Sequence, residues 1–384
     1  MTSPSNFLPE QYERTGAHVI NHNYLAQQFA DSEPIFAEIR ELVRTGDYTL
    51  GRAVDRFEQR IAGLTGSKHC VGVGSGTDAL FLSLKAAGIG EGDEVITTPY
   101  TFYATIGAIV TAGARPVFVD IREDYNIDPA RIASAITPRT KAILPVHWSG
   151  YSCEMDAIMP LARERGLAVI EDACHAIRAS YKGKPAGTFG LTGCFSLHPL
   201  KNLNVWGDGG YLVTDSSELH RKLVLLRNHG LESRDVCQVF AYNSRLDTLQ
   251  AIVANHLLDR VDQITNQRIA NAALYDRGLA GIAEVTVPRR RADIVQVYHI
   301  YVIRARRRDE LVGFLQSRGV DAKIHYPIPM HLQPAAQPYG YRRGDFPVCE
   351  SVCDSVLSLP VHEFIREEQI ERVTNLTKEF YARR

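Results

Sequence analysis

Short apolar runs alternate with stretches of helical spacing from about residue 69 onward. The apolar runs lie at 70–73, 94–97, 116–120, 142–146 and 167–170. After the first run, a turn of Gly and Ser leads into a helical stretch from Ala79 to Ala87, and Gly88 provides a stop. This alternation predicts a mostly parallel sheet with helices on both faces, which is an α/β fold. Ligand groups in such folds gather at the carboxyl ends of the strands.

The pattern changes in the last third of the chain. Residues 246–279 contain no proline and have apolar residues at spacings of three and four, which predicts one long helix. After about residue 280, strand patterns at 297–303 and 320–326 flank a helical stretch at 309–318. At 384 residues the chain exceeds what one compact core usually supports. We therefore predict a large α/β domain in residues 1–250, and a spine helix with a small α+β domain in residues 251–384.

Composition excludes several classes of protein. Lys and Arg number 43 against 44 Asp and Glu, so there is no excess charge to attract nucleic acid or an anionic membrane. No apolar run approaches the roughly 20 residues that span a bilayer. The cysteine count is odd, and no second pair with metal-ligand spacing accompanies Cys349 and Cys353. We expect a cytoplasmic protein with no metal site, no nucleic-acid partner and no membrane span.

A turn rich in small residues follows the first apolar run, with the sequence Gly72-Val73-Gly74-Ser75-Gly76-Thr77-Asp78. It lies between a predicted strand and a predicted helix, where free backbone N–H groups and the helix dipole favour a bound phosphate. A dinucleotide fingerprint would need a third glycine at the position of Thr77, because its spacing is G-x-G-x-x-G. Taken alone, the stretch is also consistent with an ordinary tight turn.

Asp172 follows the apolar run 167–170, so it lies at the carboxyl end of a predicted parallel strand. A carboxylate in this place can cap a helix. Next to a phosphate site, it can instead pair with the nitrogen of a pyridine ring and keep that nitrogen protonated.

Lys201 lies in residues 193–202, which run from a short predicted strand into an irregular loop. Most lysines are solvated surface charges. A lysine that such a loop points inward, close to a cationic ring, loses its proton more readily and can form a Schiff base.

These stretches, taken in order, resemble the sugar aminotransferases of the DegT/DnrJ/EryC1/StrS family. The resemblance covers nearly everything from Gly51 onward. Its motifs are Ser-Gly-Thr-Asp-Ala-Leu at 75–80, Thr-Phe at 101–102, Glu-Asp-Ala at 171–173, Phe-Ser at 195–196, Lys201, Gly-Asp-Gly-Gly at 207–210, Arg-Asn-His-Gly at 227–230, Tyr-Asn at 242–243 and His-Tyr at 325–326. It implies fold type I of the pyridoxal-phosphate enzymes, the aspartate aminotransferase fold, in which helices sandwich a mostly parallel sheet beside a smaller C-terminal α+β domain.

The resemblance also implies roles for individual residues. Lys201 would hold pyridoxal 5'-phosphate as a Schiff base, and Asp172 would bind the nitrogen of its ring. The other implied cofactor contacts are Gly76, Thr77, Asp78 and Ser196 at the phosphate, Phe102 stacked on the ring, and His175 near the ring hydroxyl. Asn243 would reach a phosphate in the neighbouring subunit, which implies a homodimer with two shared active sites.

The residues expected at the substrate are His325 and Tyr326, by resemblance, and Arg178, for an anionic group. Three positions depart from the family pattern. His175 stands where glutamine is common, Arg178 where a small residue is usual, and Asp208 where glutamate is frequent. None of these changes removes a catalytic group, and they leave the identity of the substrate open.

The implied reaction is the ping-pong transfer of an amino group from an amino acid, L-glutamate, to a nucleotide-linked keto-sugar. A free oxidised sugar acid or a cyclitol is an alternative acceptor. A sugar dehydratase is disfavoured because such relatives have histidine in place of the lysine, and His198 lies three positions before Lys201. A non-catalytic sugar-binding descendant would be expected to lose the cofactor residues. A nicotinamide oxidoreductase would have no use for an inward lysine.

Overall fold

The computed structural model describes residues 19–383. Its centre is a seven-stranded sheet with the strand order β1-β9-β8-β5-β4-β2-β3. β9 pairs antiparallel with both of its neighbours, whereas the other pairs are parallel. The strands are β1 (His69–Val73), β2 (Glu94–Thr97), β3 (Arg115–Phe118), β4 (Thr140–Ile143), β5 (Ala168–Asp172), β8 (Thr192–Ser196) and β9 (Gly210–Thr214). The predicted mostly parallel sheet is confirmed.

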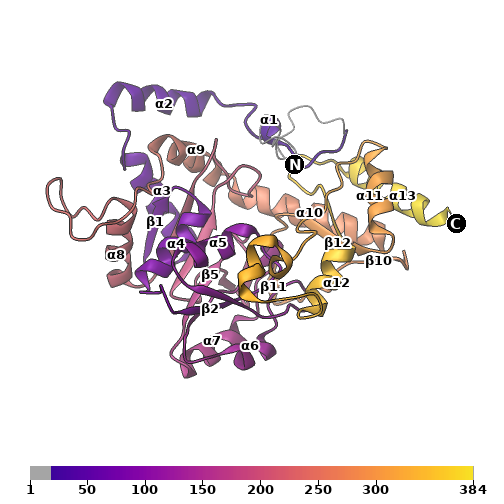
Figure 1. Ribbon diagram of the computed structural model, residues 1–384. Coiled ribbons are helices and arrows are strands. Elements are labelled where there is room, and N and C mark those ends of the chain that lie inside the picture. The colour runs from indigo at the N-terminus through magenta and orange to yellow at the C-terminus, as the bar shows by residue number, and fades with distance from the viewer. Residues whose placement is uncertain (1–18, 384) are drawn as a thin grey trace.

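Helices cover both faces of this sheet (Figure 1). Successive residues of a strand point to opposite faces, so Phe195 and Tyr211 enter one cluster of buried side chains, while Cys194 and Leu212 enter another. α3 and α9 pack on the first face, and α4, α5 and α8 pack on the second. These helices and their neighbours are α3 (Arg52–Thr65), α4 (Gly76–Ala86), α5 (Tyr103–Thr111), α6 (Pro129–Ala135), α7 (Met155–Glu164), α8 (Ser217–Arg227) and α9 (Thr248–Leu258).

The C-terminal part is built on a smaller sheet with the strand order β10-β12-β13, paired antiparallel. Helices α10, α11 and α13 pack on it around a separate apolar cluster. Its elements are α10 (Val261–Leu279), β10 (Val285–Thr286), β12 (Tyr301–Ala305), α11 (Arg308–Gln316), α12 (Pro347–Ser355), β13 (Val356–Leu359) and α13 (Glu367–Ala382). A third small sheet consists of β6 (Ser180–Tyr181), β7 (Lys184–Pro185) and β11 (Ile294–Val295). The domain boundary at residues 250 and 251 stays a prediction.

Three predicted elements differ from the structure. The strand predicted at 297–303 begins only at Tyr301, as β12, because Tyr298 has a left-handed φ of 48°. Residues 246–279 form two helices because Arg260 leaves the helical conformation, at φ −117° and ψ 3°. The break allows α9 to pack against α3 while α10 packs against α13. Residues 320–326 form no regular strand: Val320 and Lys323 make isolated bridges, and Tyr326 has a left-handed φ of 61° just before Pro327. An extended strand cannot continue through such a residue.

Polar residues interrupt even the long helix α10, which has 19 residues and carries the buried side chains of Arg268 and Asn271. No helix within residues 19–383 is long and apolar enough to cross a membrane.

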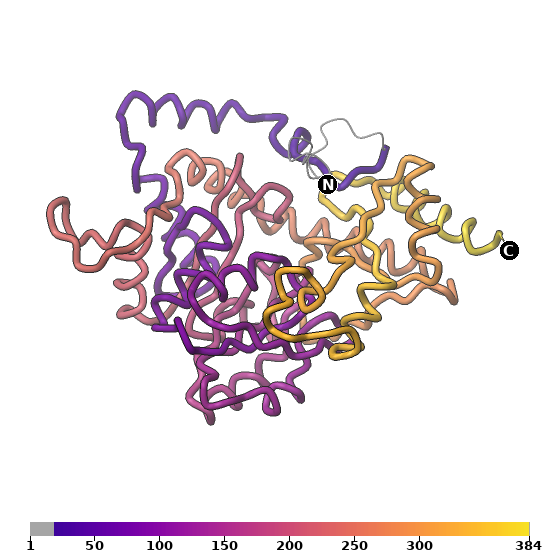
Figure 2. Tube along the Cα trace, in the orientation of Figure 1, coloured from indigo at the N-terminus to yellow at the C-terminus, as the bar shows by residue number. Residues whose placement is uncertain are grey.

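The N-terminal segment, residues 20–24, lies against the C-terminal part. The backbone N–H of Ile20 donates to the carbonyl of Gly319 at 3.0 Å, and His362 Nε2 donates to the carbonyl of Asn21 at 2.9 Å. The chain then continues through α1 (Leu25–Gln28) and α2 (Glu33–Thr45) to the helices of the large sheet, a course that the trace in Figure 2 shows. The beginning of the described chain therefore joins the two parts of the molecule.

A loop of residues 229–243, between α8 and α9, extends away from the body of the molecule (Figures 1 and 2). Its Phe240 is 98% exposed, and Val236, Val239 and Tyr242 are also exposed. Exposed apolar side chains that gather on one segment of a soluble protein usually mark an interaction surface.

Candidate active site

A cavity of about 350 Å³ opens where the carboxyl ends of the large sheet meet the N-terminal segment and the C-terminal part. This volume lies within the range of small-molecule sites, roughly 300–1,000 Å³. It brings together nine of the residues predicted from the sequence, which are Gly76, Thr77, Phe102, Asp172, His175, Ser196, Lys201, His325 and Tyr326.

The turn after β1 forms one wall of the cavity. α4 begins at Gly76, and Ser75 caps it, because Ser75 Oγ accepts the backbone N–H of Asp78 at 3.0 Å. A Cβ atom on Gly76 would lie 2.8 Å from Ser196 Cβ, so only glycine permits this close approach. The hydroxyls of Thr77 and Ser196 and the first N–H groups of the helix therefore share one place, which suits a phosphate.

An ion pair fixes the strand that leads into this turn. Arg227 pairs with Glu58, and both side chains are largely buried. Glu58 Oε1 accepts the backbone N–H of Gly72 at 2.7 Å, and Arg227 Nη1 donates to the Gly72 carbonyl at 2.9 Å. Burial raises the pKa of Glu58, and the charge of Arg227 acts in the opposite direction. The Arg-Asn-His-Gly motif thus supports the phosphate turn from behind.

Asp172 lies at the end of β5 and is 6% exposed. Its Oδ2 accepts the hydroxyl of Thr105 at 2.8 Å, and its Oδ1 accepts the backbone N–H of Cys174 at 3.2 Å. These two bonds fix the carboxylate at the cavity wall. The preceding Glu171 points to the other face of the sheet, where it lies 2.8 Å from His147 Nε2 and accepts three backbone N–H groups. Of the two acidic residues, only Asp172 lines the cavity.

Lys201 follows Leu200, which has a left-handed φ of 74° and turns the loop. The carbonyl of Lys201 accepts the side-chain amide of Asn204 at 2.9 Å and the hydroxyl of Tyr24 at 3.3 Å. Burial lowers the pKa of the Lys201 ammonium, and nearby acidic groups act in the opposite direction. A lowered pKa increases the fraction of neutral amine, which is the form that attacks an aldehyde.

His175 and Phe102 line the cavity from other loops. His175 Nδ1 accepts the backbone N–H of Ser149 at 3.3 Å, and burial lowers its pKa well below the ordinary value. The ring is therefore neutral, and we assign its single proton to Nε2 from the hydrogen-bond network. Phe102 is the N-cap residue of α5 and is 50% exposed, so the ring has a free face on which another ring can stack.

Three predicted residues do not line the cavity. Asp78 lies in the first turn of α4, and Asn243 is exposed at the base of the loop 229–243. Arg178 Nε lies 2.6 Å from Asp262 Oδ1, and both side chains are partly exposed. The roles given to these residues stay predictions.

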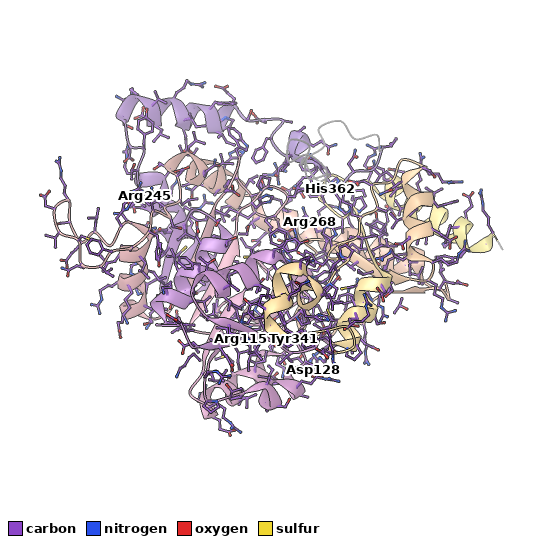
Figure 3. The ribbon with its side chains drawn as sticks, in the orientation of Figure 1. Arg115, Asp128, Arg245, Arg268, Tyr341 and His362 are labelled. Carbon is purple, nitrogen blue, oxygen red and sulfur yellow. The ribbon has the colours of Figure 1, made fainter. Side chains whose placement is uncertain are left out.

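Other residues that line the cavity belong to no motif identified in the sequence. They are His22 and Tyr24 from the N-terminal segment, and Arg268, His299 and Lys323 from the C-terminal part. Arg268 Nη2 donates to the hydroxyl of Tyr24 at 2.7 Å, and Figure 3 shows Arg268 near His362 where the two parts of the molecule meet. These residues reach the cavity through contacts between distant segments, for which the sequence offers no local signal.

The donors and acceptors of the cavity fit pyridoxal phosphate. The N-terminus of α4 and two hydroxyls suit the phosphate. The fixed carboxylate of Asp172 suits a protonated ring nitrogen, and the Nε2–H of His175 suits the ring hydroxyl. The amine of Lys201, whose pKa is lowered, suits the aldehyde carbon.

Known proteins are similar to this chain along nearly its whole length. The sequence profile of the DegT/DnrJ/EryC1/StrS aminotransferase family matches residues 30–378. The chain is 42% identical over 361 residues to a "pleiotropic regulatory protein" of Geobacillus stearothermophilus, covering 93% of this chain and 97% of that protein. It is 40% identical over 348 residues to the dTDP-3-amino-3,4,6-trideoxy-alpha-D-glucose transaminase of Streptomyces venezuelae, covering 90% and 92%.

Solved structures match equally well. The crystal structure of S. venezuelae DesV in complex with a ketimine intermediate aligns with a TM-score of 0.92 at 39% identity, covering 95% of this chain and 99% of that one. Matching structures also include one with bound pyridoxamine phosphate, the aminated form of the cofactor. The predicted family, fold, cofactor and enzyme class are confirmed, and the chain belongs to the DegT/DnrJ/EryC1/StrS aminotransferases, which are pyridoxal-phosphate-dependent sugar aminotransferases.

Proposed function

We propose that this protein transfers the amino group of L-glutamate to a nucleotide-linked keto-sugar by a ping-pong mechanism, with Lys201 as the residue that bonds the cofactor. The observation that carries the proposal is the presence of Lys201, Asp172 and the phosphate turn around one cavity. Nucleotide-linked sugars are named for relatives, among them the dTDP-sugar transaminase and a UDP-N-acetyl-3-dehydro-alpha-D-glucosamine 3-aminotransferase of Acidithiobacillus ferrooxidans.

When bound, pyridoxal phosphate supplies an electron sink for the carbon that loses or gains a proton. Lys201 would act as the base, because its neutral amine can accept the proton from the α-carbon of the donor and return it at the cofactor. Asp172 keeps the ring nitrogen protonated through its negative charge, and Thr105 holds the carboxylate in place. His175, whose Nδ1 accepts the backbone N–H of Ser149, would donate its Nε2–H to the ring oxygen.

The absorbance spectrum tests the first half of the cycle. We expect purified protein, supplied with pyridoxal phosphate, to show a visible band that L-glutamate removes, with formation of one 2-oxoglutarate per site. D-Glutamate serves as the control, because an asymmetric site presents only one face of the α-carbon to the base. A protein that binds no cofactor when supplied with it would contradict the proposal and favour the sugar-binding alternative.

The acceptor is then identified with the aminated protein. Keto-sugars linked to dTDP or UDP should restore the visible band, whereas a free oxidised sugar acid or a cyclitol should not. If only a free sugar acid or a cyclitol restored the visible band, that compound would be the acceptor in place of a nucleotide-linked sugar. Release of water from the sugar without amine transfer would instead indicate a dehydratase.

We also propose that the active unit is a homodimer in which Asn243 reaches the phosphate site of the partner. Asn243 lies at the base of the exposed loop 229–243, whose apolar side chains suit burial against a second copy. Phe240→Asp should therefore shift the protein from twice the chain mass to one chain mass in sedimentation experiments and reduce activity. Val295→Asp, at an exposed apolar position outside this loop, should leave the mass unchanged. A dimer that survives Phe240→Asp intact would argue against this loop as the contact.

A further inference from the structure

Three cationic side chains line the cavity among the residues that the structure describes: Lys201, Arg268 and Lys323. Lys201 is assigned to the cofactor. The guanidinium of Arg268 is nearly enclosed and donates to Tyr24 and to two backbone carbonyls. It also lies 3.3 Å from Glu363 Oε2, so its charge is neutralised within the protein. Of these three cations, Lys323 is therefore the one available to bind a substrate.

The side chain of Lys323 is held less tightly by the protein than that of Arg268. Its Nζ lies 3.5 Å from Asp321 Oδ2, which is an ion-pair distance longer than an ordinary hydrogen bond. The same Oδ2 accepts the backbone N–H of His22 at 2.9 Å, so this oxygen is shared. The side chain of Lys323 is 23% exposed. Its ammonium therefore keeps donor capacity on the cavity side.

Two imidazoles accompany this ammonium at the cavity wall. The positive charge of Lys323 contributes to lowering the pKa of His22 and that of His325, after the larger effect of burial. Both rings are therefore neutral. A hydrogen bond to the Ser358 backbone acts in the opposite direction on the pKa of His22, and its buried Nε2 has no partner of ordinary hydrogen-bond geometry within residues 19–383. A buried polar atom without a partner is costly unless a ligand satisfies it.

Lys323 and Lys201 reach the cavity from different parts of the fold. The acidic groups that act on the pKa of Lys201 are Cys174 and Asp172, which lie at or just after the end of β5. Lys323 instead lies beside β13, where its backbone N–H donates to the Ser358 carbonyl at 3.1 Å. A group bound there belongs to a part of the substrate remote from the carbon that exchanges the amine.

We propose that Lys323, together with His22, forms a subsite for a carboxylate that lies remote from the reacting carbon of the substrate. This inference rests on the proposed aminotransferase function and adds a substrate class to it. A remote carboxylate can come from two sources, the side chain of a dicarboxylic amino donor or an acceptor sugar oxidised to a uronic acid. In both cases an ammonium and a neutral imidazole supply charge-assisted and ordinary hydrogen bonds to the same group.

Equilibrium binding tests the subsite without requiring turnover. The protein, loaded with cofactor, is titrated calorimetrically with two pairs of probes that differ only in one carboxylate. UDP-glucuronate against UDP-glucose reports a sugar acid, and glutarate against pentanoate reports a donor side chain. For one of the two pairs, we expect the wild type to bind the member with the additional carboxylate more tightly than the other member. In Lys323→Met, the affinity for that member should fall by about tenfold or more. The other member should change by less than about twofold, because it makes no such bond.

Three outcomes would overturn the subsite. These are equal wild-type affinity for both members of each pair, an equal loss for both members in Lys323→Met, and no loss at all. Lys323→Arg, which keeps the charge, should retain the preference, and Lys141→Met, at an exposed lysine of β4, should behave as wild type. Failure of L-glutamate to aminate the cofactor would instead count against the proposed function, because these titrations involve no amine transfer.

Discussion

Replacing Lys201 with alanine is expected to abolish amino transfer, with a loss of about a thousandfold or more. The variant lacks both the amine that bonds the aldehyde carbon of the cofactor and the base that moves the proton. The loop should persist, because its hydrogen bonds to Asn204 and Tyr24 use the backbone carbonyl of Lys201. Steady-state kinetics measure the loss, and thermal unfolding checks that the fold is retained.

Intact mass after borohydride reduction provides a second readout for the same variant. Reduction should add the cofactor mass to the wild type and none to Lys201→Ala. Lys141→Ala, which removes an exposed lysine from β4, should keep both the added mass and the activity. A cofactor still bonded covalently to Lys201→Ala would assign the bond to another amine and remove Lys201 from the mechanism.

Replacing Asp172 with asparagine should reduce the turnover number by about a hundredfold to a thousandfold. The amide has nearly the shape of the carboxylate but carries no charge, so a protonated ring nitrogen is no longer favoured over a neutral one. The ring is then a weaker electron sink. The rate at which L-glutamate removes the visible band, measured in single turnovers, isolates this step from sugar binding.

A matched control for this charge removal is Asp354→Asn, at an exposed carboxylate outside the cavity. It should keep the full rate. Because an amide offers one acceptor oxygen where the carboxylate offers two, Asp172→Asn also weakens the contact to either Thr105 or the N–H of Cys174. A small drop in unfolding temperature is therefore expected. An unchanged rate in Asp172→Asn would exclude this residue as the partner of the ring nitrogen.

Most of the large sheet could be predicted because the strands β1 to β5 contain short apolar runs, with turns and helical patterns between them. Continuous apolar runs of this kind are typical of parallel strands that are buried on both faces. The long helix predicted at 246–279 was wrong, because periodicity does not show where a helix changes its packing partner, as happens at Arg260. The strand predicted at 320–326 failed at Tyr326, whose left-handed backbone is imposed by its surroundings.

Some residues of the site could likewise be predicted from the sequence, and others could not. Asp172 and Lys201 could be identified because strand ends and loops of the large sheet carry local motifs, and both residues line one cavity. His22 and Lys323 could not, because they meet through contacts between segments about 300 residues apart. Arg178, predicted as an anion contact, pairs with Asp262 instead of lining the cavity.

The N-terminal segment has a consequence for the order in which the protein matures. Ile20 bonds to Gly319 and Asn21 to His362, so the segment that carries His22 and Tyr24 to the cavity wall is held by residues far along the chain. During translation the large sheet can form while this wall has no partner, because domains generally fold as units as they emerge from the ribosome. A nascent chain could therefore hold the cofactor residues of the large sheet in place before it can enclose a sugar. Competence for catalysis would arrive only after the segment around His362 has emerged from the ribosome.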